Sequence, residues 1–345
     1  MTTTKTTKGF GSKMMAALLA VATALGLAVV AAPGASAEDN PNFRPRPGCT
    51  WADKGPSGVK FYVQDCDVWS AAMGQNIKVQ IKPAAQGGDA GLYLLDGLRA
   101  RDDWNAWGPW GGAPEQFVND NVTLVMPVGG QAQFYTDWIG PWDGTNGPRK
   151  PRWETFLTAE LPDYLQKNFG VSKTRNGIVG LSMGGTAAMN LAAHHRDQFK
   201  QVTSLSGYLN PTWPGMYAGI EIAMLDSAGP GARIWDMWGN PLDLTRFRND
   251  PLLNTPQLSG IPMYISAAAG VPEPGRDFLA DPLGTSVGVG LEWMARTSTA
   301  KFELAARATG SNPVTDYPIT GIHDWPLWKS ELVKAKPHIQ AALGY

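Results

Sequence analysis

Residues 176–190 read NGIVGLSMGGTAAMN and carry the most specific structural pattern of the chain. The apolar pair at 178–179 predicts the end of a buried strand, and the residues from Thr186 onward predict a helix. Between them, residues 180–184 match G-x-S-x-G, whose glycines permit a turn tight enough to raise a serine hydroxyl to the helix N-terminus. The stretch therefore predicts a strand, a sharp turn that presents Ser182, and a helix.

Short apolar runs recur along the chain and predict an α/β fold. Residues 77–81 alternate like a half-exposed strand, whereas the other runs are continuously apolar, as in a buried parallel sheet. Those continuous runs lie at 91–95, 122–126, 178–181 and 263–266. Helical spacing at 153–169 and 185–194 alternates with them. With the turn at Ser182, this order predicts the α/β-hydrolase fold, a mostly parallel central sheet flanked by helices.

We expect one catalytic domain over residues 73–345, because 43% hydrophobic residues can bury a sizeable core and the length suits one large domain. Residues 210–254 contain helical patches but no clear strand. They are predicted to form a helical insertion above the carboxyl edge of the sheet, where such insertions often shape substrate sites. Residues 38–72 begin rich in Pro, Gly and charge and are predicted to be an extended N-terminal segment.

Residues 1–37 have the pattern of a secretory signal peptide. Three lysines precede an apolar run at 14–32, and residues 35–37, Ala-Ser-Ala, fit the small-x-small pattern that signal peptidase cleaves. The run is interrupted at Thr23 and Gly26 and closed by Pro-Gly, which favours export over a membrane anchor. We therefore expect a protein secreted to the cell envelope.

The chain has two cysteines, Cys49 and Cys66. Because exported compartments oxidise thiols, this pair predicts a disulfide near the mature N-terminus. Two buried free thiols are the alternative, since the spacing of two cysteines in the sequence does not give their distance in space.

Composition and motifs exclude several classes of partner. The 29 Lys and Arg residues nearly balance the 30 Asp and Glu residues, which argues against a nucleic-acid surface and against electrostatic binding to anionic lipid. No Cys/His or carboxylate cluster has metal-ligand spacing, and no phosphate-binding glycine loop follows a strand. We expect no metal, no cofactor and a monomeric chain.

Four histidines could serve as a base for Ser182. His194 and His195 lie about three turns along the helix that follows the serine, so they are predicted to point away from it as solvated helix-end residues. His338 lies in the predicted terminal helix. His323 follows a short apolar run and precedes that helix, which is where the order Ser, acid, His places the base.

The acid of such a triad should lie between Ser182 and His323, after the strand that ends near Ser266. The sequence pattern alone does not choose among four candidates, which are Glu273, Asp277, Asp281 and Glu292. For the oxyanion hole, one backbone N–H is expected from Met183 and a second from the loop that begins at Asp96.

From about Met73 to the C-terminus, the chain resembles the antigen 85 and corynomycolyltransferase family of mycolic-acid transferases. The resemblance rests on long motifs, which are YLLDGLRARDDWN at 93–105, VMPVGGQAQFYTDW at 125–138, WETFLTAELP at 153–162, GLSMGG at 180–185, DMWG at 236–239 and RNDPLLN at 248–254. It implies an enzyme that moves mycolyl chains from trehalose monomycolate to a second trehalose ester or to cell-wall arabinogalactan.

The resemblance also implies roles for single residues. A family Glu before an Arg-Thr-Ser stretch supplies the acid, and Glu292 stands before residues 296–298, which read Arg-Thr-Ser here. The family's oxyanion donors correspond to the backbone N–H groups of Leu98 and Met183. Its trehalose contacts correspond to Asp96, Arg99 and Trp325. Without the resemblance, Asp96 and Arg99 would be read as a turn with a surface ion pair, and Trp325 as a packed core aromatic.

The chain departs from the family in two places. The family's cysteine pair before the WETF helix is absent, since residues 150–152 read Lys-Pro-Arg. Residues 267–290 also diverge, which leaves the lipid channel and the acyl length open.

Two other functions stay open from the sequence. A secreted carboxylesterase would use the same triad, because one serine turn serves lipases, esterases and transferases alike. A wall-binding protein without activity is the second alternative, and the 14 tryptophans suit sugar stacking.

Overall fold

The sheet is built from the apolar runs of the sequence, with short strands added at its edges. The computed structural model describes residues 40–55, 58–145 and 147–345. Its main strands are β1 (Cys49–Trp51), β4 (Gln64–Ser70), β5 (Gln75–Lys82), β6 (Ala90–Leu95), β7 (Val122–Pro127), β8 (Asn176–Leu181), β9 (Phe199–Leu205), β10 (Met263–Ser266) and β11 (Val314–Asp316). A separate short pair consists of β2 (Lys54–Gly55) and β3 (Gly58–Val59).

The strand order in the main sheet is β1-β4-β5-β7-β6-β8-β9-β10-β11. From β7 to β11 neighbouring strands are parallel, and β5, β4 and β1 extend the sheet as antiparallel neighbours. Parallel neighbours require crossover connections, which the helices supply. The α/β-hydrolase architecture predicted from the sequence is therefore confirmed.

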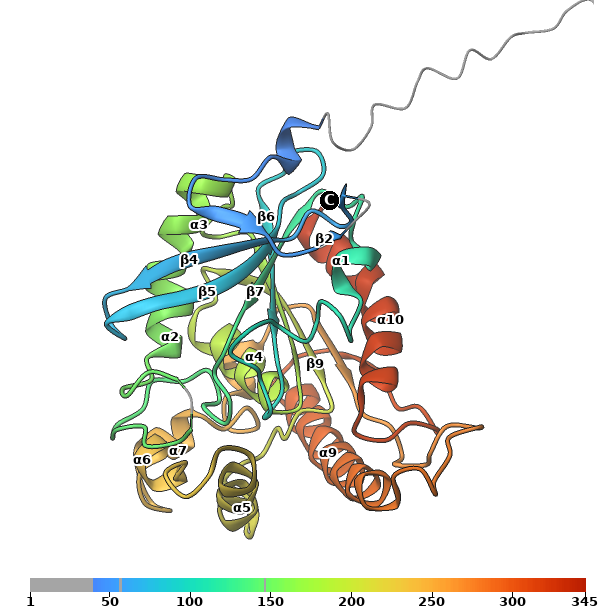
Figure 1. Cartoon of the computed structure of the whole chain (residues 1–345). Coiled ribbons are helices and arrows are strands. Elements are labelled where there is room, and N and C mark those ends of the chain that lie inside the picture. Colours follow the sequence, from blue (N-terminus) through green and yellow to red (C-terminus); the bar gives the residue numbers. More distant parts are fainter. Residues whose placement is uncertain (1–39, 56–57, 146) are drawn as a thin grey trace, which may run out of the picture. The chain divides into compact units, whose positions relative to one another are not determined.

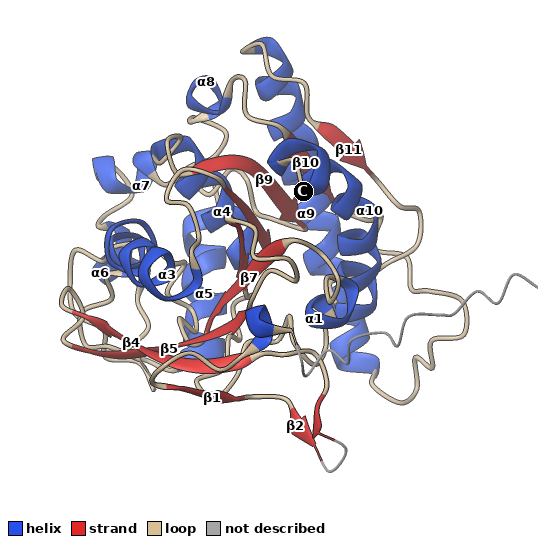
Figure 2. Cartoon of the chain, turned by 90° about the horizontal axis from the view of Figure 1, so that it is seen from above, coloured by secondary structure: helices blue, strands red, loops and turns tan. Residues whose placement is uncertain are grey.

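The helices cover both faces of the sheet and its carboxyl edge. They are η2 (Pro41–Phe43), α1 (Ala113–Gln116), α2 (Trp153–Thr155), η3 (Phe156–Glu160), α3 (Leu161–Phe169), α4 (Met183–His194), α5 (Met216–Ala228), α6 (Ile234–Trp238), α7 (Leu244–Arg248), α8 (Thr255–Leu258), α9 (Pro282–Ala308) and α10 (Trp325–Leu343). The helix predicted at 153–169 is one continuous stretch whose middle, η3, is a π-helix. Seen from above, α3 and α4 lie on one side of the strands, and α1 and α10 lie on the other (Figure 2).

Alternation along each strand divides the core into two layers. On β6, Tyr93 and Leu95 pack in the same cluster as side chains of α3 and α4, while Leu92 and Leu94 pack with side chains of α1 and α10. All four side chains are fully buried. Successive side chains of a strand point to opposite faces of the sheet. Because helices cover both faces, every position of a strand such as β6 is buried, and the strand is continuously apolar.

The helical insertion predicted at 210–254 contains α5, α6 and α7 and no strand. In Figure 1 these helices and α9 lie below the sheet, on the side where the loops after the parallel strands emerge. The insertion contacts one of those loops directly, since the Ser227 hydroxyl donates to the Leu98 carbonyl oxygen at 3.1 Å. The insertion therefore lies next to the predicted site.

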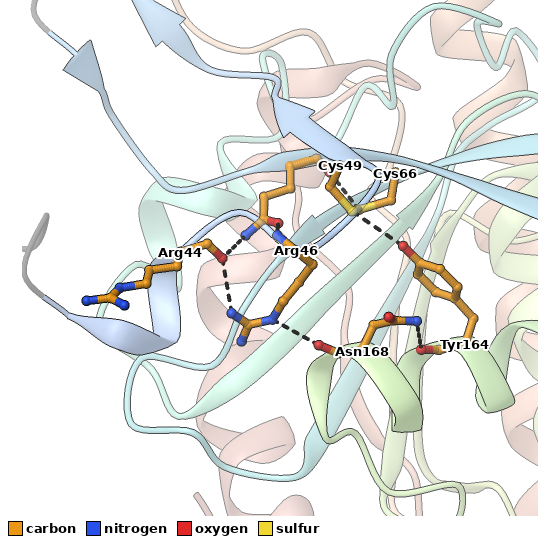
Figure 3. The surroundings of a disulfide bond; sticks show 7 residues. Arg44, Arg46, Cys49, Cys66, Tyr164 and Asn168 are labelled. Atoms are coloured by element: carbon orange, nitrogen blue, oxygen red, sulfur yellow. Dashed lines mark hydrogen bonds between the residues drawn. A yellow bond between two sulfur atoms is a disulfide. The ribbon is translucent and has the colours of Figure 1, made fainter.

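The N-terminal edge departs from the sequence prediction. Residues 38–72 were expected to be an extended segment that precedes the domain, but β1 and β4 join the main sheet. Cys49 and Cys66 face each other across these two strands and form a disulfide, as expected. Tyr164 of α3 contacts the Cys49 sulfur, and Arg46 donates to the carbonyl oxygen of Asn168 at the end of α3 (Figure 3).

The sequence patterns predicted β5, β6, β7, β8 and β10 at the right places but missed β9. Lys200 and Gln201 interrupt the apolar run of that strand. Lys200 is exposed, whereas Gln201 is buried and donates to the hydroxyl of Thr203 at 2.7 Å. A buried polar side chain with its own local partner hides a central strand from a hydrophobicity pattern.

The expected signal peptide, residues 1–37, lies outside the described residues. Within the described ranges, every helix is too short or too polar to cross a bilayer.

An ion cluster ties the insertion to the body of the fold. Glu154 of α2 accepts hydrogen bonds from Arg248 of α7 at 2.6 and 2.9 Å and bonds the ring of His195 at 2.7 Å. Burial alone would raise the pKa of Glu154, but the hydrogen bonds from His195 and Arg248 outweigh it and lower the pKa to about 2. The ionised carboxylate is therefore the stable form in the folded chain.

We predict that Glu154→Gln destabilises the fold in a pH-dependent manner. A depressed carboxyl pKa stabilises the folded state at pH values above the ordinary carboxyl pKa of 4.5. This stabilisation is lost as the pH falls through about 2, the pKa of Glu154 in the folded chain. The expected loss of unfolding free energy is about 3 kcal/mol at pH 7 and about 1 kcal/mol at pH 3. Urea unfolding at the two pH values measures it, with exposed Glu115→Gln as the control. Equal losses at both pH values would contradict this account.

Candidate functional site

Ser182 lies at the sharp turn between β8 and α4, where the sequence predicted it. Its backbone has φ 52° and ψ −120°, a positive-φ conformation that non-glycine residues rarely adopt. The residue is 6% exposed, and its backbone N–H donates to the Leu205 carbonyl oxygen of β9 at 2.8 Å. The turn thus holds the serine in a strained conformation at the N-terminus of α4, as in a nucleophile elbow.

The structure brings Ser182, His323 and Glu292 into one hydrogen-bonded chain. His323 Nε2 lies 2.8 Å from Ser182 Oγ, and His323 Nδ1 lies 2.9 Å from Glu292 Oε2. With a proton on Nδ1, the ring donates to the carboxylate, and Nε2 is free to accept the serine proton. The His323 side chain is 6% exposed and that of Glu292 is fully buried, so water competes little for these bonds.

Glu292 is held by two further donors that no sequence pattern had indicated. Its second oxygen accepts from the Ser206 hydroxyl at 2.9 Å and from the Ala268 backbone N–H at 2.7 Å. Ser206 in turn accepts from the indole N–H of Trp328 at 3.0 Å. Ser206 lies just after β9 and has a positive φ of 52°. In the sequence, the serine followed by glycine at the end of an apolar run was the one feature that could have indicated its role.

The other three candidate acids lie in the loop before α9 and form ion pairs or hydrogen bonds with other groups. Glu273 pairs with Arg276, and the Asp277 carboxylate accepts from the Leu279 backbone N–H. Asp281 caps the N-terminus of α9 by accepting from the Gly284 N–H. Among these four carboxylates, Glu292 is the one that reaches the His323 ring.

The remaining histidines bond elsewhere. His195 bonds Glu154, and His194 bonds the Arg248 carbonyl oxygen at 2.9 Å. Both are half-buried at the end of α4, so their prediction as solvated residues is wrong in detail, although they do point away from Ser182. Burial lowers the pKa of His194. His338 packs against the ring of Tyr264.

The two expected oxyanion donors lie in segments that pack against each other. Met183 is the first residue of α4, so its N–H has no acceptor within the helix. Leu98 lies in the loop after β6, and its carbonyl oxygen accepts from the Ala132 N–H at 2.9 Å as well as from Ser227. A Cβ built on Gly97 would lie 3.8 Å from the Ser182 Cβ, so this loop lies against the serine turn.

The three expected sugar contacts have different surroundings. Asp96 is 4% exposed, and burial raises its pKa to about 6, although both of its oxygens accept backbone N–H groups, from Gly97 and Ala106. Arg99 is exposed and pairs with Asp226 of α5 at 2.6 Å. Trp325 is half-buried at the start of α10. Its ring makes edge contacts with three other tryptophans, which are Trp107, Trp110 and Trp328.

Known proteins resemble this chain over most of its length. Residues 70–339 match the model of the Esterase family. The diacylglycerol acyltransferase/mycolyltransferase Ag85A of Mycobacterium ulcerans is 41% identical over 283 residues, which is 82% of each chain. The Ag85B enzyme of Mycobacterium intracellulare is 37% identical and covers 98% of this chain and 96% of its own length.

The chain belongs to the antigen 85 mycolyltransferase family. Among solved structures, Mycobacterium tuberculosis MPT51 (FbpC1) matches with a TM-score of 0.70 and 29% identity, covering 81% of this chain and 98% of its own. The serine hydrolase FphF of Staphylococcus aureus matches with a TM-score of 0.58 at 17% identity, which shows the shared fold. The match to the Mycobacterium intracellulare relative spans nearly the whole chain.

We predict that Glu292→Gln lowers the rate of Ser182 acylation by about 10³- to 10⁴-fold. The amide favours the wrong tautomer of His323 and no longer stabilises the protonated ring. Stopped-flow bursts with a p-nitrophenyl ester measure the rate. Asp277→Asn, a matched change of another sequence candidate, should acylate at the wild-type rate, and a comparable loss in that variant would contradict the assignment of Glu292.

Proposed function

We propose that this protein is a serine acyltransferase that moves mycolyl chains from trehalose monomycolate to a second trehalose monomycolate or to cell-wall arabinogalactan. The observation that carries the proposal is the chain of hydrogen bonds from Glu292 through His323 to Ser182, in a member of the antigen 85 family. The curated relatives are named diacylglycerol acyltransferase/mycolyltransferase.

In the first half of the cycle, Ser182 Oγ attacks the ester carbonyl carbon of the donor while its proton passes to His323 Nε2. The backbone N–H groups of Leu98 and Met183 are proposed to stabilise the resulting oxyanion. The tetrahedral intermediate then expels the trehalose oxygen, which takes the proton from His323. The product is an ester between Ser182 and the acyl chain.

In the second half, a hydroxyl of the acceptor sugar gives its proton to His323 and attacks the acyl-enzyme. His323 returns that proton to Ser182 Oγ as the new ester leaves. Transfer therefore requires that a bound sugar hydroxyl attack the ester before water does. Residues that hold this hydroxyl close to the acyl carbonyl give it the advantage over water. We assign this positioning to Asp96, Arg99 and Trp325.

A hydrolase would use the same first half, and the match to the Esterase family favours it as the second candidate. In that case water takes the place of the sugar, and free fatty acid replaces the diester. We further propose that the chain acts outside the cytoplasmic membrane, in the cell envelope, because its N-terminal residues have the pattern of an export signal.

We predict that the mature protein converts a trehalose monoester of a long branched acid into the diester. Ser182→Ala should form neither diester nor an acyl adduct, because the attacking oxygen is gone. Thin-layer separation of the lipids and the intact protein mass give both readouts. Free acid without diester would assign an esterase, and neither product nor adduct in the wild type would overturn the proposal.

We predict that Arg99→Met raises the KM for the trehalose acceptor by about tenfold, since it removes a charged hydrogen-bond donor to the sugar. The acylation of Ser182 by a p-nitrophenyl ester should stay unchanged. Arg101→Met is the control, because Arg101 lies two residues away and pairs locally with Asp103. An equal effect of both changes on the acceptor KM would argue against a sugar contact at Arg99.

A further inference from the structure

The backbone at His323 is held in a three-residue turn. The Asp324 N–H donates to the Ile322 carbonyl oxygen at 2.7 Å, so His323 is the middle residue of the turn. The His323 N–H itself donates to the carbonyl oxygen of Gly288 on α9 at 3.0 Å. The position of the imidazole therefore depends on whatever fixes this turn.

Asp324 fixes one side of the turn with both of its carboxylate oxygens. One oxygen accepts from the Trp325 N–H at 2.7 Å and caps α10. The other accepts from the Arg276 guanidinium, also at 2.7 Å. Arg276 donates in addition to Glu273 at 3.1 Å, so a single guanidinium bridges two carboxylates. Its side chain is 22% exposed, which leaves it partly screened from water.

Arg276 lies in the loop between β10 and α9. The start of this segment is paired with the chain that leads to His323, through Ala269 N–H to Pro318 and Gly321 N–H to Val271. Figure 1 shows the orange loop between β10 and α9 beside the redder segment that leads into α10. Arg276 adds a further contact between these two segments, at Asp324, the residue directly after His323.

We propose that Arg276 is a positioning residue that holds the His323 turn through Asp324. The inference rests on the proposed role of His323 as the base. The ion pair joins the loop between β10 and α9 to the residue directly after His323. It therefore limits movement of the turn that sets the position of the His323 ring between Glu292 and Ser182. Because Arg276 is 22% and Asp324 41% exposed, water still reaches the pair, which is expected to add little to global stability. The effect is therefore expected in the chemical step.

The geometry at position 276 suits Arg better than Lys. A planar guanidinium can donate to two carboxylates at fixed angles, whereas an ammonium is a point charge on a flexible stem. Arg276→Lys keeps the charge but loses the fixed geometry, so it should retain part of the positioning of the His323 turn.

The test uses the full mature chain with Arg276→Met, Arg276→Lys, Asp324→Asn and the double variant Arg276→Met/Asp324→Asn. Asn is as good a helix N-cap as Asp, so Asp324→Asn keeps the α10 cap and removes the charge that faces Arg276. Arg307→Met is the control, because it breaks the Arg307–Glu303 pair at the other end of α9. Titration with a fluorophosphonate counts the active sites, so misfolded protein does not enter the rate.

We predict that Arg276→Met and Asp324→Asn each slow Ser182 acylation by a p-nitrophenyl ester by about tenfold per active site, with KM within about twofold. The double variant should be no slower than either single variant, since both remove the same contact. Arg276→Lys should recover part of the rate, and Arg307→Met should match the wild type.

Two outcomes overturn the inference alone. One is wild-type acylation by Arg276→Met, and the other is a double variant whose loss is the product of the two single losses. Failure of the wild type itself to acylate at Ser182 would instead defeat the proposed function on which the inference rests. Wild-type acylation by Arg276→Met together with a lowered melting temperature would show that the ion pair is structural only.

Discussion

Close backbone packing at the serine turn is the constraint on which the rest of the site depends. A Cβ on Gly180 would lie 2.0 Å from the Gly184 carbonyl oxygen, and a Cβ on Gly184 would lie 2.4 Å from that of Asp96. Neither contact is possible, so β8, α4 and the loop after β6 can approach this closely through glycine alone. The same approach places Met183 and Leu98, the two proposed oxyanion donors, next to Ser182.

The long helix α9 holds the two residues that contact His323, and His323 in turn contacts the serine turn. On α9, Gly288 and Glu292 are one turn apart and therefore share a face. Gly288 accepts from the backbone of His323, and Glu292 accepts from its ring. A Cβ on Gly288 would lie 3.0 Å from the Ile322 side chain, so glycine also allows the His323 turn to lie against the helix.

The sequence was most informative where chemistry and local structure coincide. The G-x-S-x-G match predicted the turn at Ser182, because the glycines, the strand and the helix that define it are neighbours in the sequence. The order of Ser, acid and His along the chain pointed to His323. Spacing could not separate Glu292 from Glu273, Asp277 and Asp281, because the choice depends on how α9 packs, which is a tertiary property. The family resemblance supplied that choice. Ser206 was missed because its role depends on Glu292 and Trp328, which lie 86 and 122 residues away.

The edges of the sheet were less predictable for a related reason. A strand such as β4, whose side chains alternate between buried and exposed, is stabilised by β1, β5 and the disulfide rather than by an apolar run of its own. The insertion shows the same dependence on distant partners. Its Ser227 bonds the Leu98 carbonyl, and its Asp226 pairs with Arg99. Helix α5 therefore contacts both a proposed oxyanion donor and a proposed sugar contact, and it links these two positions through one rigid element.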